Sequence, residues 1–140
     1  MTARLVVLAL ALTLAAPAAF AGDPARDALL QAFSTQAAKG APDFRGFSAA
    51  AGEKLFRTRW SGGDERTPSC STCHTDNPRQ PGQNAKTGRP IDPVAPSVNP
   101  KRFTDMDQVE KQFARDCKSV LGRACTAQEK GDYITFMAGQ

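Results

Sequence analysis

Long hydrophobic runs, internal repeats and alternating strand patterns are scarce in this chain, and each absence excludes a class of protein or fold. A single apolar stretch, Leu5 to Leu14, stands out among the 140 residues, so we expect no membrane span in the rest of the sequence. The 18 lysines and arginines only slightly exceed the 14 acidic residues and form no dense cluster, which argues against nucleic acid as a partner. The lack of strand patterns favours an all-α fold.

The N-terminal segment, residues 1–21, has the features of a secretory signal peptide. Arg4 supplies the positive charge, the apolar run follows it, and Ala19 and Ala21 are small residues at the positions that a signal peptidase recognises. The run is short for a retained membrane anchor. We therefore predict cleavage after Ala21, a single mature domain over residues 22–140, and a periplasmic location in which thiols oxidise.

Cys70, Cys73 and His74 form the sequence C-S-T-C-H, the attachment motif of c-type haem. The spacing places two thiols on one edge of the macrocycle, and the adjacent histidine then reaches the iron as the proximal ligand. A thioredoxin-like redox pair would need a surrounding βαβ pattern, which is missing. A zinc site is disfavoured because Cys117 and Cys125 lack the C-x-x-C spacing of a second ligand pair and the chain has no second histidine. We predict one covalent haem c.

Four helices are predicted from caps and apolar stripes. Residues 22–40 carry Pro24 in the first turn and an apolar stripe. Ser48 caps residues 49–57. Thr104, with Asp107 three residues on, caps a helix that runs to about residue 117. The capping box of Thr126 and Glu129 starts the last helix. We expect the helix over 49–57 to cross the last one at four residues: Gly52, Phe56, Tyr133 and Phe136.

Residues 75–100 contain too many prolines for a helix, and so long a loop is expected where the chain wraps a cofactor. Together with the helices, this predicts the all-α, class I cytochrome c-like fold around one haem.

The sixth iron ligand is not settled by the motif. His74 is the single histidine, which excludes a second histidine ligand from this chain. Met106 and Met137 are candidates. Met137 lies on an apolar helix face and is better explained as core, whereas Met106 could face the haem or equally pack as core. Asp116 continues the helical stripe of Met106, Val109 and Phe113, and burial of a carboxylate is costly unless it is paired or bound to metal. Alternatively, Asp116 faces solvent or pairs with Arg115 or Arg123.

Cys117 and Cys125 are predicted to form a disulfide after export. It closes a short loop between the last two helices, and we expect it to fix the end of the helix that carries Asp116.

The chain from about Gly52 to Gln140 resembles the sphaeroides haem proteins, which are small single-haem cytochromes. The resemblance is carried by the runs TPSCSTCH, APSVNPKRFTD and VEK, by the pairs Gly82-Gln83 and Thr87-Gly88, and by the segments Cys117-Lys118-Ser119-Val120, Gly122-Arg123, Cys125-Thr126 and Glu129-Lys130. It implies an axial asparagine just before the first disulfide cysteine, which releases the iron on reduction so that oxygen or nitric oxide can bind. It also implies a dihaem cytochrome c as the electron donor. The position of that asparagine is occupied here by Asp116.

Three functional hypotheses follow. The first is a periplasmic monohaem cytochrome that transfers electrons and has a weakly ligated or open sixth position, with Asp116 as the distal candidate. An aspartate there favours ferric iron over ferrous. The second is an ordinary His/Met electron carrier that uses Met106 or Met137. The third is a reductase of peroxide, oxygen or a nitrogen oxide. We expect a redox carrier or ligand-binding protein before a dedicated enzyme.

Overall fold

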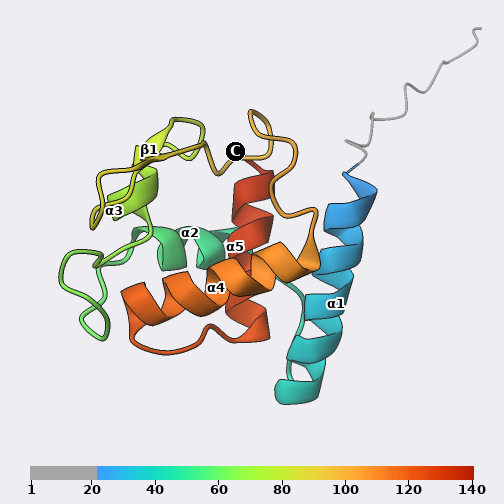
Figure 1. The fold of residues 1–140 in the computed structure, drawn as a ribbon. Coiled ribbons are helices and arrows are strands. Elements are labelled where there is room, and N and C mark those ends of the chain that lie inside the picture. Colours follow the sequence, from blue (N-terminus) through green and yellow to red (C-terminus); the bar gives the residue numbers. More distant parts are fainter. Residues whose placement is uncertain (1–21) are drawn as a thin grey trace, which may run out of the picture.

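The computed structural model describes residues 22–140, and the predicted signal peptide lies outside this part. The predicted all-α fold is confirmed: five helices with long connecting loops make up nearly all of the regular structure (Figure 1). In chain order the elements are α1 (Pro24–Gly40), α2 (Ala49–Arg57), α3 (Ser71–His74), β1 (Gly82–Gln83), β2 (Pro90–Ile91), α4 (Met106–Leu121) and α5 (Ala127–Ala138).

The strands β1 and β2 correct the expectation that the chain has no strand. They pair antiparallel inside the proline-rich loop, with Gly82 opposite Ile91 and Gln83 opposite Pro90. Two-residue strands are too short to show an alternating pattern, which is why the sequence did not reveal them.

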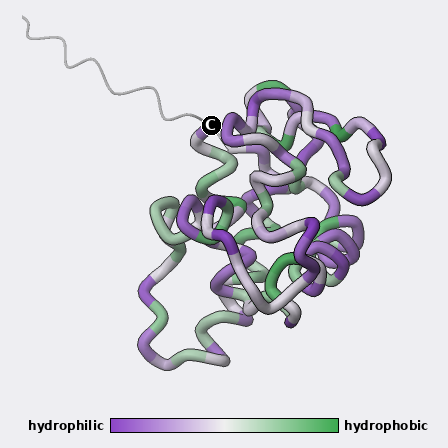
Figure 2. The backbone as a smooth tube through the Cα atoms, turned by 90° about the vertical axis from the view of Figure 1, so that its left-hand side faces the viewer, coloured by the Kyte–Doolittle hydropathy of each residue, from purple (hydrophilic) through white to green (hydrophobic). Residues whose placement is uncertain are grey.

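No helix within residues 22–140 is long and apolar enough to cross a membrane. Figure 2 shows hydrophobic and hydrophilic residues interspersed along the described chain instead of one long hydrophobic segment. The apolar residues gather in the interior, where Phe33, Phe56, Ile134 and Met137 are fully buried.

The crossing of α2 and α5 forms the centre of the fold, as predicted (Figure 1). The ring of Phe56 lies 6.1 Å from that of Tyr133 and 5.8 Å from that of Phe136. At Gly52 a side chain would overlap the backbone carbonyl of Asp132, so the close approach of the two helices requires glycine. The buried Asp132 carboxylate accepts a hydrogen bond of 2.7 Å from the backbone N–H of Ser48, and so ties the start of α2 to α5.

The caps of α2 and α5 are those predicted. The Ser48 hydroxyl accepts from the N–H of Ala51 at 3.2 Å. Thr126 and Glu129 form the reciprocal capping box, with distances of 3.1 and 2.8 Å. These caps are local, so the sequence is sufficient to locate them.

The boundaries of α4 differ from the prediction at both ends. Asp105, not Thr104, caps the helix and accepts from the N–H of Gln108 at 2.9 Å, whereas the Thr104 hydroxyl donates to the carbonyl of Lys101. The helix continues past residue 117 because Val120 and Leu121 are buried in the core, and it ends at Gly122, whose φ of 73° is left-handed.

The N-terminal helix α1 starts at Pro24, two residues later than predicted, because Asp23 caps it. Leu29 and Phe33 are buried as expected. Arg26, a charged residue one turn before Leu29, is buried too, which no local sequence pattern predicts.

Candidate haem-binding site

A cavity of about 810 Å³ lies between α4, the loop before α3 and the hairpin of β1 and β2. This volume falls within the roughly 300–1,000 Å³ range of ligand and cofactor pockets. The walls are largely apolar, and the hydrophobic side chains among them include Leu55, Ile91, Val94, Val109, Phe113, Val120, Leu121 and Tyr133. Such walls exclude water from a flat apolar group and leave a few polar atoms to orient it.

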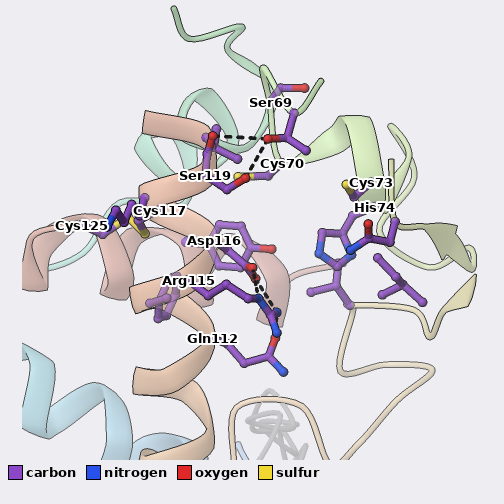
Figure 3. Close-up of a pocket in the computed structure, with 18 of the residues that line it drawn as sticks. Ser69, Cys70, Cys73, His74, Gln112, Arg115, Asp116, Cys117, Ser119 and Cys125 are labelled. Atoms are coloured by element: carbon purple, nitrogen blue, oxygen red, sulfur yellow. Dashed lines mark hydrogen bonds and ion pairs between the residues drawn. A yellow bond between two sulfur atoms is a disulfide. The ribbon is translucent and has the colours of Figure 1, made fainter. Parts of the chain in front are cut away.

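Cys70, Cys73 and His74 line one wall of this cavity (Figure 3). A single helical turn brings them together, since the backbone N–H groups of Cys73 and His74 both donate to the carbonyl of Cys70, at 3.2 and 3.1 Å. The buried Ser69 hydroxyl contacts the hydroxyl of Thr72 at 2.9 Å and fixes the start of this turn. Neither Cys70 nor Cys73 is in a disulfide, so both thiols are available for covalent attachment.

The protonation of these groups suits a haem better than a redox thiol pair. Burial raises the pKa of the Cys70 thiol to about 12, and the Asp116 charge adds to the shift. Burial also lowers the pKa of His74, with the positive charge of Arg102 as a second cause. His74 is therefore a neutral imidazole, the form that ligates metal. Its Nδ1 is the one buried side-chain nitrogen or oxygen in residues 22–140 that has no hydrogen-bond partner.

Asp116 lines the cavity from α4, across from His74 (Figure 3). Its carboxylate pairs with Arg115, whose Nε and Nη2 lie 2.7 and 3.3 Å from Oδ1 and Oδ2. Of the two ion-pair partners considered from the sequence, Arg115 is the one found, because Arg123 pairs with Glu129 instead. Asp116 lies on the cavity side of α4, as its place in the helical stripe predicted, and its side chain is half-buried there.

The two candidate methionine ligands lie elsewhere. Met137 is fully buried in the hydrophobic core, and Met106 packs against that core from the first turn of α4. Within the part of the chain that the structure describes, neither is among the residues that line the cavity.

Cys117 and Cys125 form a disulfide, as the sequence predicts. The disulfide joins α4 to the segment just before α5. Cys117 follows Asp116 directly in α4, and both cysteines lie at the cavity wall.

A polar cluster at the cavity wall was missed by the sequence analysis. Lys86 Nζ lies 2.9 Å from Asp64 Oδ2 and donates to the Ser119 hydroxyl at 2.8 Å, and that hydroxyl also contacts Thr67. The guanidinium of Arg66 and then the ammonium of Lys86 hold the pKa of the Asp64 carboxyl far below its usual range. These residues come from three separate segments, so no local pattern could have revealed the cluster.

Comparison with known proteins agrees with this geometry. Residues 42–137 match a family described as Domain of unknown function (DUF1924). The chain is 44% identical to cytochrome c-type protein SHP of Cereibacter sphaeroides over 95% of this chain and 97% of that protein. It belongs to the sphaeroides haem protein family. The family assignment makes the chain a c-type cytochrome with one covalently attached haem.

Solved structures support the same family. The structure of oxidised SHP, an oxygen-binding cytochrome c, matches with a TM-score of 0.75 and 41% identity, covering 85% of this chain and all of that one. Cytochrome c'' of Methylophilus methylotrophus is 38% identical over 69% of this chain and 67% of its own length. Its solution structure, which concerns haem-ligand detachment, matches with a TM-score of 0.71 and 32% identity, over 82% of this chain and 93% of that one.

Proposed function

We propose that Cys70 and Cys73 bind the haem covalently and that His74 is its proximal iron ligand. The observation that carries the proposal is the cavity itself, with two free thiols and a neutral imidazole on one wall and apolar side chains around them. The haem supplies an iron that changes between ferric and ferrous states and offers a coordination position to a small ligand. The chain's own residues hold, orient and shield this group.

The sixth position, in this proposal, faces Asp116 and is weakly ligated or open. Asp116 is the acidic side chain that lines the wall of α4 across from His74, whereas neither methionine lines the cavity within residues 22–140. The carboxylate already has a partner in Arg115, so it can leave the iron without being left as an unpaired charge. One relative is an oxygen-binding cytochrome c and the other undergoes haem-ligand detachment. We propose O2 or NO as the ligand class for this chain.

The same proposal places the protein in the periplasm after removal of residues 1–21, where a redox partner supplies electrons. A dihaem cytochrome c is the partner that the family resemblance implies.

The test is the visible and electron paramagnetic resonance spectrum of the purified holoprotein, ferric and then ferrous with and without carbon monoxide. We expect a high-spin ferric signal and ready binding of carbon monoxide to the ferrous form. Met106→Leu serves as the matched control and leaves both spectra unchanged. A low-spin ferric spectrum with the far-red methionine-to-iron band, lost in Met106→Leu or Met137→Leu, would instead establish the His/Met electron carrier.

A further inference from the structure

The positive charges on the cavity wall differ in how they are compensated. Within residues 22–140, five basic side chains line the cavity: Lys86, Arg89, Arg102, Arg115 and Lys118. Two of them have a carboxylate partner, since Lys86 pairs with Asp64 and Arg115 with Asp116. Arg89 and Lys118 are exposed and are solvated by water. Of these five, Arg102 alone is both partly buried and without an acidic partner within residues 22–140.

The contacts of Arg102 leave its charge uncompensated. Its Nε donates to the carbonyl of Pro93 at 3.1 Å and its Nη2 to the carbonyl of Asp92 at 3.0 Å. Its Nη1 donates to no group within residues 22–140. Neutral carbonyls orient a guanidinium but do not cancel its charge, and a partly desolvated charge without a counter-ion is costly. A negative ligand group in the cavity would remove this cost.

Arg26 on α1 holds the backbone of Arg102 in place. Its guanidinium is buried, and it donates twice to the carbonyl of Arg102, at 3.0 and 3.3 Å, and once to that of Pro100, at 3.0 Å. These partners are 74 and 76 residues away in the sequence. Arg26 therefore holds the backbone of Arg102, and the side chain of Arg102 in turn holds the carbonyls of residues 92 and 93. Together they fix the loop of residues 92–103 at the cavity, although neither arginine is paired with an acid in the described chain.

We propose that Arg102 binds a propionate carboxylate of the haem and that Arg26 is a positioning residue that holds Arg102 for this contact. The inference rests on the proposed function, because it requires the haem to occupy the cavity. Haem carries two propionates on the edge away from the thioether links, and they are its only anionic side groups. The planar fork of an arginine suits a carboxylate better than any other side chain, and a charge-assisted hydrogen bond of this kind is roughly twice as strong as a neutral one.

The experiment compares the holoprotein with Arg102→Gln, Arg102→Lys, Arg26→Gln and the control Arg45→Gln. Arg45 is exposed and lies outside the cavity, so its replacement removes the same charge elsewhere. The readouts are the midpoint potential and the propionate bending bands of the resonance Raman spectrum. Arg102→Gln shifts these bands and lowers the potential, because the cation disfavours the more positive ferric state. Arg102→Lys restores most of the potential but not the bands, Arg26→Gln shifts the bands, and Arg45→Gln changes neither.

The haem content of each sample, measured by its pyridine haemochrome spectrum, distinguishes a failure of the role of Arg102 from a failure of the proposed haem attachment. Covalent haem in the wild type together with unchanged bands in Arg102→Gln overturns the role of Arg102 and leaves the proposed function standing. A wild type without covalent haem overturns both. If Arg102→Gln does not fold, Arg102→Lys decides, and bands identical to those of the wild type in that variant overturn the inference.

Discussion

At the scale of single residues, Asp116 is where we predict that this chain departs from the family to which it belongs. The family resemblance implies a neutral asparagine at this position, and aspartate replaces it with an anion. The ion pair with Arg115 does not lock the carboxylate in place, because the two side chains are 44% and 70% exposed. Ion pairs of this exposure contribute about 0–1 kcal/mol. The carboxylate is therefore free to exchange between Arg115 and the proposed iron site.

Replacing Asp116 by asparagine raises the midpoint potential, because it removes an anion that stabilises ferric iron. The expected change corresponds to about 1–4 kcal/mol, the interaction of two unit charges about 4 Å apart between the dielectric of water and that of a protein surface. Potentiometric titration of the holoprotein measures it. Asp116→Ala is the companion variant and raises the potential as well, while removing the ligand atom altogether. Equal potentials in all three proteins would mean that the carboxylate does not face the iron.

At the scale of elements, the fold depends on one close helix crossing and on well-capped helix starts. The α2–α5 crossing brings Phe56, Tyr133 and Phe136 together, and Tyr133 continues from this packing into the cavity wall. The position of one side of the haem site is thus set by the same contact that holds the core together.

Gly52→Ala tests the crossing. The new methyl group would overlap the backbone carbonyl of Asp132. Because the methyl carbon is bonded directly to the backbone of α2 and cannot rotate away, the helices must separate. We expect a loss of about 1–3 kcal/mol in the free energy of unfolding, the usual cost of overpacking a core, as measured by denaturant titration. Gly40→Ala is the matched control. Nothing lies within 4 Å of a side chain there, so this change is neutral or stabilising.

Glu129 links the start of α5 to the pH dependence of stability. Its hydrogen bond with Arg123 is the main reason that its pKa lies below the ordinary value of 4.5. Because the unfolded chain takes up this proton first, the stabilisation is present above that value and is lost as the pH falls through the lower folded pKa. Glu129→Gln keeps an oxygen that can accept from the Thr126 N–H but loses the ion pair with Arg123. It therefore lowers the free energy of unfolding at neutral pH by about 0–1 kcal/mol and flattens its decline in acid.

Denaturant titrations at several pH values measure this effect. The control is Glu65→Gln, an exposed residue without an ion pair in residues 22–140, whose profile should parallel the wild type. If the free energy of unfolding of Glu129→Gln declined with pH as steeply as that of the wild type throughout the acid range, Glu129 would not contribute to the pH dependence of stability.

At the scale of the whole molecule, the cavity is too large for the protein to maintain dry and empty. The cavity of about 810 Å³ opens to solvent, and its apolar side chains would contact water if nothing filled it. The haem is therefore an integral part of the core, and without it the cavity must fill with water or collapse.

The double variant Cys70→Ser, Cys73→Ser removes the proposed attachment and tests this dependence. We expect a protein that keeps helical far-ultraviolet circular dichroism but loses near-ultraviolet signals and binds a hydrophobic dye, the behaviour of a loosely packed state. Ser71→Ala lies between the same cysteines and serves as the control, with haem content and packing like those of the wild type. A rigid, cooperatively folded double variant would show that the polypeptide alone closes the core.

The sequence by itself determined the helices with local signals and the chemistry of the haem motif. Caps at Ser48 and Thr126 act within three or four residues, and the spacing of Cys70, Cys73 and His74 is set by covalent chemistry, so neither needs the rest of the fold. The helical period of residues 106–116 made Asp116 a candidate for the cavity side of α4, with solvent or an ion pair as the alternative. Only the tertiary structure decided that Arg115 is the partner of Asp116, that neither methionine lines the cavity, and that Arg26 donates to the carbonyl of Arg102, 76 residues away. The reason is physical: burial, ion pairing and hydrogen bonding to distant carbonyls depend on which segments meet in space, and no local pattern records that.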